Sequence, residues 1–342
     1  MTPLTPTRYF THLAAAVVVL AVMFMLNMAV SQVGFSFKPL LGYLEYSEQS
    51  SNDLAIVSAR FRRVITAAIV GAALAAAGVA FQSLLRNPLA SPFILGVSSG
   101  SALGVIVYSF LTMQLHWYME VPVHVASLAF GALTMLLVYA LSRRRGQIDP
   151  LTLLLVGVIV NAFNSALIML ISALATTHQR ADMAKWLMGY IKELDLANRD
   201  IWIAGVAVLA GWIVLQTQSK SFNLQALGEP TAGSLGVNVA KSQAICFFVG
   251  SLMTSAAVAV SGPIGFVGLI CPHLCRAVIG PDHRLLMIWS TVLGAVFLAC
   301  SDTLCRATIQ LLGSELPVGV VTALCGGPFF IYLLRNSVQR EF

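Results

Sequence analysis

Asp302 is the residue of this sequence that could most readily do chemistry, because it is the only carboxylate well inside a long apolar run. A charge in such surroundings is costly and is therefore either functional or paired. Arg306 stands four residues later, on the same face of a helix, and is the expected partner. No second carboxylate in an apolar run could take a proton from Asp302. An ion pair that orients Arg306 is therefore favoured over a proton relay.

The stretch Cys271-Pro-His273-Leu-Cys275 suggests a metal site at first sight, since residues 271 and 275 share a helical face. His273 points elsewhere on that turn and no fourth ligand is apparent, so we predict no metal and no cofactor in this chain. The cysteines lack Cys-x-x-Cys spacing and lie in apolar runs, which is typical of small buried residues. They are Cys246, Cys271, Cys275, Cys300, Cys305 and Cys325. No span pairs carboxylates or a nucleophile with a base, so the chain is not expected to be an enzyme.

The composition places these residues in a membrane. Of 342 residues, 58% are hydrophobic and 10% are charged, with a net charge of +6 and a mean hydropathy of +0.84. A soluble domain is about 25% charged, and a helical crossing takes about 20 apolar residues. We therefore predict an all-α polytopic protein, one transmembrane domain over 1–342 that contacts lipids and binds no nucleic acid. The ten expected spans are 13–33, 64–84, 93–112, 123–142, 151–174, 201–216, 242–261, 264–279, 286–305 and 318–334.

An even number of crossings places both termini on one side, and the arginines at 143–145 favour the cytoplasm as that side. The run 13–33 resembles a secretory signal, but its apolar core is too long, so a retained helix is expected. Other arginines then fall outside. Three crowd a helix start in SARFRRV (58–64), and Arg306 is the fourth. They form either a docking surface for an acidic partner or snorkelling contacts with lipid, and the residues alone leave both open.

Small and polar residues recur inside two of the expected spans. They are Ser98, Ser99, Gly100 and Ser101 in the third span, and Asn161, Asn164 and Ser165 in the fifth. Such residues either line a polar pathway or let helices approach and hydrogen-bond to one another. Gly100 and Gly104 have Gly-x-x-x-Gly spacing, which favours helix packing. The asparagines leave both interpretations open.

The stretch LQALGEPTAGSLGVN (224–238) lies between two apolar runs, yet it is too polar and too rich in Gly and Pro to cross a bilayer. Glu229-Pro230 can open a short helix, and Gly236 can close it. A helix this short is unstable alone, so we expect it to lie at the cytoplasmic face and pack against something else. A phosphate loop would need glycine at 235 and 240, where Leu235 and Ala240 stand. ATP-driven transport would then require another chain to hydrolyse the ATP.

Four blocks of this sequence resemble the FecCD-type permease family, the membrane subunits of bacterial ABC importers for iron-siderophores, haem and cobalamin. The blocks are RNPLASPFILGVSSGSALG (86–104), ALGEPTAGSLGV (226–237), SGPIGFVGLICPHLCR (261–276) and DTLCRATIQLLGSELPVGVVTALCGGPFFIYLLR (302–335). They occur in the family's order, and the resemblance covers residues 60–335.

The resemblance implies about ten helices in the bacterial inner membrane, with both termini cytoplasmic and short coupling helices between the sixth and seventh spans. Two permease subunits, identical or different, would work with two ATP-binding cassette ATPases that hold ATP and Mg. The positions that match the ATPase coupling motif are Ala226, Leu227, Gly228, Glu229, Ala232, Leu235 and Gly236. Those that match an outer gate are Trp186, Leu187, Met188 and Gly189.

The resemblance also favours docking as the role of the outer arginines. The family pattern Arg-Leu-Pro-Arg appears here as Arg60-Phe-Arg62-Arg63, with Arg62 in place of proline, and an Asp-x-x-x-Arg pattern matches Asp302 and Arg306. It implies that Arg60, Arg63 and Arg306 bind acidic residues of a periplasmic or lipid-anchored substrate-binding protein. The replaced proline leaves the local bend of the helix in question.

The expected function is translocation of a ferric siderophore, or of a haem or cobalamin type of ligand, and no residue chooses among them. The alternative is a secondary transporter driven by an ion gradient. It would need an ion or proton site in the membrane, for which Asp302 is the only carboxylate candidate. Transport that requires ATP and persists when ion gradients are collapsed would exclude this alternative.

Overall fold

Helices make up almost all of the structure, a computed structural model that describes residues 5–31, 34–35, 51–114, 122–144, 146–191 and 198–338. The strands β1 (Val30–Ser31) and β2 (Gly34–Phe35) form one antiparallel pair, and β3 (Arg143–Arg144) and β4 (Gln147–Ile148) form another. The all-α fold class is confirmed. The helices are α1 (Pro6–Ala29), α3 (Ser51–Leu85), α4 (Val97–Gln114), α5 (Val123–Ser142), α6 (Pro150–Leu174), α7 (Thr177–Leu187), α8 (Asn198–Thr217), α9 (Ser219–Gln225), α10 (Glu229–Ser234), α11 (Val239–Ser261), α12 (Val267–Ile279), α13 (His283–Leu312) and α14 (Val318–Val338).

The predicted membrane spans are confirmed as helices. Within the described residues, eight helices are long and apolar enough to cross a membrane, namely α1, α3, α4, α5, α6, α8, α11 and α13. Two shorter apolar segments, Val267–Ile279 in α12 and Val318–Ile331 in α14, account for the other two predicted spans. The boundary predicted at Gly262-Pro263 is also confirmed, since α11 ends at Ser261 and Gly262 takes a φ of 67°.

Helix α3 lies at the centre of the bundle and packs most extensively against α13. Its buried surface is rich in alanine and glycine, alongside large residues such as Leu74 and Phe81. Gly71 of α3 and Gly294 of α13 touch backbone to backbone, because a Cβ added to Gly71 would lie 2.1 Å from the Gly294 carbonyl oxygen. Small residues allow such close approach between membrane helices. The alanines of α3 that are fully buried are Ala67, Ala73, Ala75, Ala76, Ala77 and Ala80.

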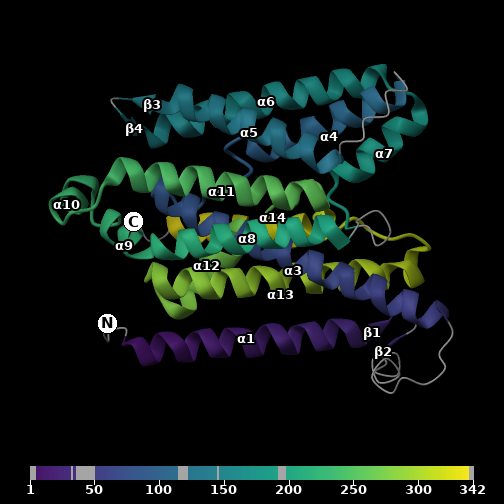
Figure 1. Ribbon diagram of the computed structural model, residues 1–342, viewed down its shortest axis with the longest axis horizontal. Helices are drawn as coiled ribbons and strands as arrows, with labels where there is room; N and C mark the ends of the chain where they lie inside the picture. The colour runs from purple at the N-terminus through teal and green to yellow at the C-terminus, as the bar shows by residue number, and fades with distance from the viewer. Residues whose placement is uncertain are drawn as a thin grey trace.

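Helices α4, α5 and α6 form a layer along one side of the bundle, at the top of Figure 1. Gly100 and Gly104 of α4 face α5: added Cβ atoms would lie 2.0 Å from the hydroxyl oxygen of Thr134 and 2.4 Å from the carbonyl oxygen of Ala126. The predicted role of these two glycines in helix packing is therefore confirmed.

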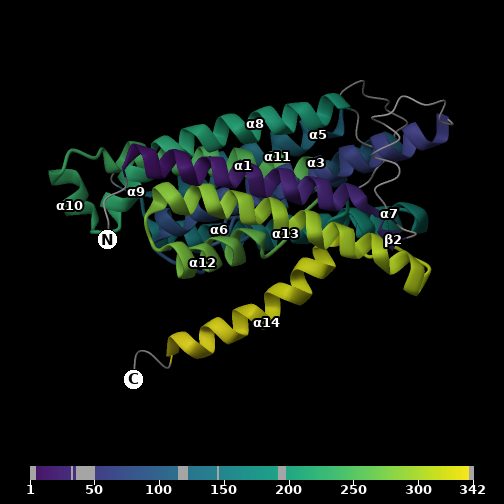
Figure 2. The same cartoon turned by 90° about the horizontal axis from the view of Figure 1, so that it is seen from below.

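The two ends of the bundle differ in what they carry. Figure 1 shows α9, α10 and the beginning of α1 at one end and α7 at the other. Helix α14 leaves the bundle at an angle and ends on the α10 side, as Figure 2 shows. Both terminal helices thus have their free ends on the side of α10, as an even number of crossings predicts.

The predicted helix start in SARFRRV is wrong. Helix α3 begins at Ser51, so Arg60 and Arg63 lie within the helix rather than at its first turn. Arg62 stands where the resembling family has proline, and it leaves the helix uninterrupted because it retains the backbone N–H that proline lacks. Residues 36–50 and Arg145 of the basic cluster lie outside the described residues.

We predict that Gly71→Ala destabilises the protein by about 1–3 kcal/mol, because the added methyl group forces α3 and α13 apart. A lower thermal midpoint in detergent would be the measured result. Gly327→Ala in α14 is the matched control, since nothing lies within 4 Å of its added Cβ. If both variants unfold at the temperature of the unchanged protein, the close contact between α3 and α13 is not as described.

Candidate functional site

Arg63 and Asp302 form a buried ion pair between α3 and α13. The Arg63 Nε atom lies 2.9 Å from Oδ2 of Asp302, and its terminal NH2 nitrogen lies 2.9 Å from Oδ1. The two side chains are 5% and 1% exposed. The planar guanidinium matches the two carboxylate oxygens, which gives this pair both strength and a fixed direction. It joins positions 239 residues apart in the sequence.

Two further charges complete this site. The Arg306 Nε atom lies 3.4 Å from Oδ2 of Asp302, so the predicted pair exists, although the closer partner is Arg63. Glu315, between α13 and α14, accepts a hydrogen bond from Arg63 as well. We refer to Arg63, Asp302, Arg306 and Glu315 as the ion-pair cluster. Both of its arginines are buried in the single chain, whereas Arg60 is half-buried.

The predicted gate residues lie at the end of α7, close to this cluster. A capping box at Thr176 and Gln179 starts the helix, and Gly189, with a φ of 75°, ends the segment after it. Trp186 and Gly189 pack against the loop after α11, since a Cβ at Gly262 would lie 2.4 Å from the Trp186 carbonyl oxygen. Residues 192–197 of the outer segment lie outside the described residues. We call Trp186–Gly189 the gate segment.

The polar residues of α4 and α6 meet at one hydrogen bond. Asn164 donates from Nδ2 to the Ser99 hydroxyl oxygen at 3.1 Å, and Ser99 donates to the Gly96 carbonyl at 2.9 Å. Asn164 is buried and Asn161 is half-buried. Ser98 is buried within α4. These contacts hold α4 against α6. Some of the polar residues whose role the sequence leaves open therefore serve helix packing.

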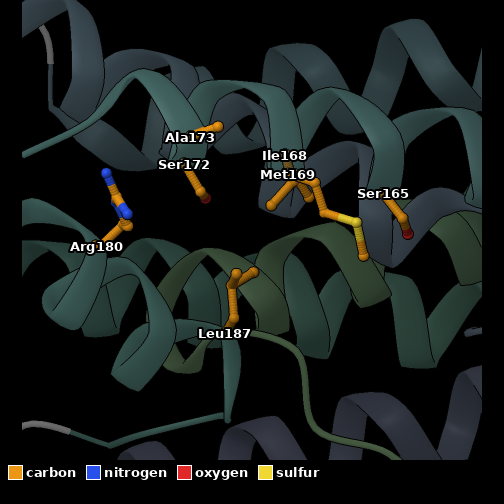
Figure 3. Close-up of a pocket in the computed structure, with 7 residues that line it drawn as sticks. All are labelled: Ser165, Ile168, Met169, Ser172, Ala173, Arg180 and Leu187. Carbon is orange, nitrogen blue, oxygen red and sulfur yellow. The ribbon is translucent and has the colours of Figure 1, made fainter.

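A cavity of about 440 Å³ lies between α6 and α7. It brings a predicted pathway residue, Ser165, together with a predicted gate residue, Leu187, and Figure 3 shows both on its walls. Arg180 also lines it and donates to the Ala175 carbonyl oxygen at 3.0 Å. The remaining lining residues are Ile168, Met169, Ser172 and Ala173. The walls are mostly apolar, with two hydroxyl groups and the Arg180 guanidinium.

Two short helices, α9 and α10, form the segment between the sixth and seventh spans, at the opposite end from the gate segment. The predicted helix opening at Glu229 and its closure at Gly236 are confirmed, and Gly236 has a φ of 87°. Ala232 is fully buried and anchors α10 to the bundle. Leu227 and Leu235 are 65% and 57% exposed. The segment therefore presents two large apolar side chains outward, one on each side of an anchored short helix.

Glu229 fixes α10 to the rest of the protein. Its Oε1 atom lies 2.7 Å from Arg86, which follows α3, and it accepts a hydrogen bond from Gln243 of α11 at 3.2 Å. These contacts tie the short helix to two of the long helices. A displacement of α10 would therefore reach α3 and α11.

Asn223 anchors α9, a role that the sequence does not indicate because Asn223 lies outside every motif. It donates to Asp282 at 2.8 Å and accepts from the backbone N–H of His283 at 2.9 Å. Burial alone would raise the pKa of Asp282, but hydrogen bonds from Arg284 and Asn223 outweigh it and lower this pKa to about 2. Asp282 therefore stays ionised and holds α9 against the start of α13.

The cysteines are buried as predicted at four positions, Cys246, Cys271, Cys275 and Cys305. The prediction is wrong for Cys300 and Cys325, which are exposed on the single chain. An apolar run does not distinguish a side that faces the core from a side that faces lipid, and this explains the difference. The described residues contain no group of three His, Cys, Asp or Glu side chains that could hold a metal ion.

A bundle of apolar helices, eight of them in the described residues long enough to span a bilayer, defines a multi-pass membrane protein. The sequence model of the FecCD transport family matches residues 19–336. The chain therefore belongs to the FecCD transport family.

Relatives agree with this assignment over most of their length. The uncharacterised ABC transporter permease protein YvrB of Bacillus subtilis is 41% identical over 82% of this chain and 78% of its own length. The cobalamin import system permease protein BtuC of Halobacterium salinarum is 37% identical over 87% of this chain and 78% of its own.

A solved structure described as an inward-facing conformation of a metal-chelate type ABC transporter matches the fold. It covers 96% of this chain and 99% of its own, with a TM-score of 0.79 and 29% identity. The chain is thus an ABC importer permease of the metal-chelate, siderophore, haem or cobalamin type. It is a multi-pass protein of the bacterial inner membrane.

We predict that Asp302→Asn destabilises the protein by about 3–5 kcal/mol, because it leaves the buried Arg63 and Arg306 with Glu315 as the one remaining carboxylate of the cluster. The measurement is the thermal midpoint of the purified protein in detergent. Asp182→Asn is the control, since Asp182 pairs with His178 while 53% exposed and surface pairs contribute little. Equal midpoints for the two variants would show that the ion-pair cluster is not a structural centre.

Proposed function

We propose that this chain is the permease subunit of an importer that carries a ferric siderophore across the inner membrane. A substrate-binding protein delivers the ligand at the end with the ion-pair cluster. Two ATPase subunits bind the end with α10 and supply the energy. Two permease subunits together enclose the path of the ligand.

The apolar projection of α9 and α10 carries the proposal. Leu227 and Leu235 are large and exposed, and they flank α10, which Ala232 and Glu229 fix to the bundle. A side chain of this kind gains most by entering a pocket of another protein. A groove of an ATPase subunit is such a pocket, and the anchoring contacts would pass its movement to α3 and α11.

The outer end supports docking of an acidic protein. Arg63 of α3 and Arg306 of α13 meet there at Asp302, and Arg60 stands three residues before Arg63 in α3. Glu315 links this cluster to Tyr190, which follows the gate segment. Complementary charge steers association and fixes the register of the partner. The side chains of Arg63 and Arg306 are 5% and 6% exposed, whereas Arg60 is half-buried, so Arg60 is the most accessible of the three to a partner.

The substrate class rests on the relatives and on the cavity. Relatives are named for the import of hemin and of iron(3+)-hydroxamate as well as of cobalamin. All of these are bulky chelates, and the apolar walls with hydroxyl groups around Ser165 and Ser172 suit such a ligand passing without tight binding. Among them we propose the ferric siderophore.

Exposed apolar surface supports a second permease subunit. Ile331 and Leu324 of α14 and Phe163 of α6 are each more than half exposed on the single chain. Helix α14 stands away from the bundle (Figure 2), so its sides need cover from lipid or from another subunit. A pair of permeases that closes around these helices would alternate its opening by rigid-body tilting.

The geometry of Asp302 argues against a transporter driven by an ion gradient. Such a transporter needs an intramembrane group that takes up and releases an ion. Asp302 is 1% exposed and is held by Arg63 on both oxygens. A carboxylate so enclosed is a poor carrier of protons or sodium.

The function is tested with the complex of permease and ATPase subunits in liposomes, using a ferric hydroxamate on the binding protein. Uptake should require ATP and should persist when ionophores collapse the ion gradients. We predict that Leu235→Asp lowers uptake at least tenfold while membrane insertion is unchanged, because a charge cannot enter the apolar groove of the ATPase.

Ser234→Ala is the matched control for this variant, since it is a neighbouring exposed residue of α10 with a hydroxyl bonded only locally to the Thr231 carbonyl. Its uptake should equal that of the unchanged complex. Uptake that follows the ion gradient and ignores ATP would refute the ABC mechanism. Normal uptake by Leu235→Asp would remove α10 from the coupling contact.

We predict that Arg60→Glu weakens binding of the binding protein about tenfold at low salt and less at high salt, because salt screens charges near a surface. Binding is measured by surface plasmon resonance on the complex in nanodiscs. The control is Arg199→Glu, a basic residue at the beginning of α8 that is 70% exposed. If Arg60→Glu binds as the unchanged protein does, Arg60 is a lipid contact.

A further inference from the structure

The ion-pair cluster is connected to the gate segment through Glu315. One of its carboxylate oxygens accepts from Arg63, and the other accepts from the Tyr190 hydroxyl at 2.7 Å. Tyr190 follows the gate segment directly in the sequence. Side-chain contacts therefore connect Asp302, through Arg63 and Glu315, to Tyr190. None of the sequence motifs assigns a role to Glu315 or to Tyr190.

The backbone around Tyr190 is hydrogen-bonded to α11 and α14. Its N–H donates to the Ser261 carbonyl at the end of α11, at 2.9 Å. The Gly189 carbonyl accepts from the N–H of Gly319 in α14, at 3.2 Å. Glu315 stands four residues before Gly319, on the segment that leads into this helix. A change at Glu315 is therefore placed to alter how the gate segment sits between α11 and α14.

The charges of the cluster cancel, and this constrains how an acidic partner can bind there. Arg63 and Arg306 carry two positive charges, while Asp302 and Glu315 carry two negative charges. An additional carboxylate would meet no net attraction from this group of four. It binds favourably only if it replaces one of the two internal carboxylates.

Glu315 is the carboxylate that a partner would replace. Its side chain is 14% exposed, compared with 1% for Asp302. Asp302 also binds Arg63 through two oxygens, whereas Glu315 contacts it through one. Bidentate pairs are the stronger kind, so competition falls on Glu315.

We propose that Glu315 and Tyr190 form a latch that senses docking. An acidic side chain of the binding protein takes the place of Glu315 at Arg63, Glu315 releases Tyr190, and the gate segment is freed to move. This inference rests on the proposed docking at the arginines. Because coupling between two sites is reciprocal, loosening the latch also strengthens docking.

The test follows the exposure of the gate in the reconstituted complex. Met188→Cys is introduced, and its reaction rate with a membrane-impermeant maleimide is followed by peptide mass, so that the native cysteines do not interfere. Tyr190→Phe removes only the hydroxyl group, and Glu315→Gln removes the charge. Both should raise the rate several-fold in the absence of binding protein.

Saturating binding protein, purified with the complex, should raise the rate in the otherwise unchanged Met188→Cys protein to that of the two variants. It should add little to the variants, since their latch is already open. Tyr190→Phe should also tighten docking by about fivefold or more, although it changes no charge. Tyr9→Phe is the control, because Tyr9 loses a hydrogen bond from Gln216 at the other end of the bundle.

Equal labelling rates in all the proteins would overturn the latch. So would an acceleration by binding protein that is as large in the variants as in the parent, because a merely structural role for the hydrogen bond predicts such independent effects. The docking proposal fails separately: it requires that Arg60→Glu weaken binding. If that requirement is met and Tyr190→Phe changes neither labelling nor affinity, only the latch is wrong.

Discussion

Contact between the backbones of α3 and α13 is the constraint on which the rest of the structure depends. Helices in lipid gain little from burying large apolar side chains, so close approach through small residues must hold them together. Gly71 meets Gly294 in this way, and Gly78 of α3 meets Gly268 of α12. Arg63 lies eight residues before Gly71 and Asp302 lies eight residues after Gly294, about two turns from the crossing in each helix. The crossing therefore places Arg63 beside Asp302. Without this close approach, the buried charges could not reach one another.

The sequence predicts most of the fold and about half of the site. Apolar length is enough to find the spans, and Pro230 and Gly236 are enough to find α10, because these signals are local. The pair of Arg63 with Asp302 was not predicted, because spacing rules relate residues of the same helix and identify only Arg306 as a partner of Asp302. Glu315 and Asn223 escape for the same reason: their partners are distant in the sequence and are set by how the helices cross. The exposure of Cys300 and Cys325 escapes because lipid-facing and core-facing surfaces share one composition.

The two ends of the molecule use opposite physical means. At the outer end, charges are paired inside the protein, so an incoming group must compete with contacts that already exist. At the α10 end, apolar side chains are exposed, so a partner with an apolar groove can bind them without displacing other contacts. Under the proposed function, competition makes the interface with the binding protein selective and reversible, whereas exposed Leu227 and Leu235 favour a more persistent interface with the ATPases.

The length of α3 has a mechanical meaning. Its 35 residues extend over about 52 Å, whereas the hydrocarbon layer is about 30 Å thick. The helix is therefore long enough to extend beyond the hydrocarbon layer. Arg62, in place of proline, leaves it without a kink near its outer end. A lateral force on the part of α3 that projects from the bilayer would therefore tilt the whole helix, including its middle, rather than bend it at the membrane surface.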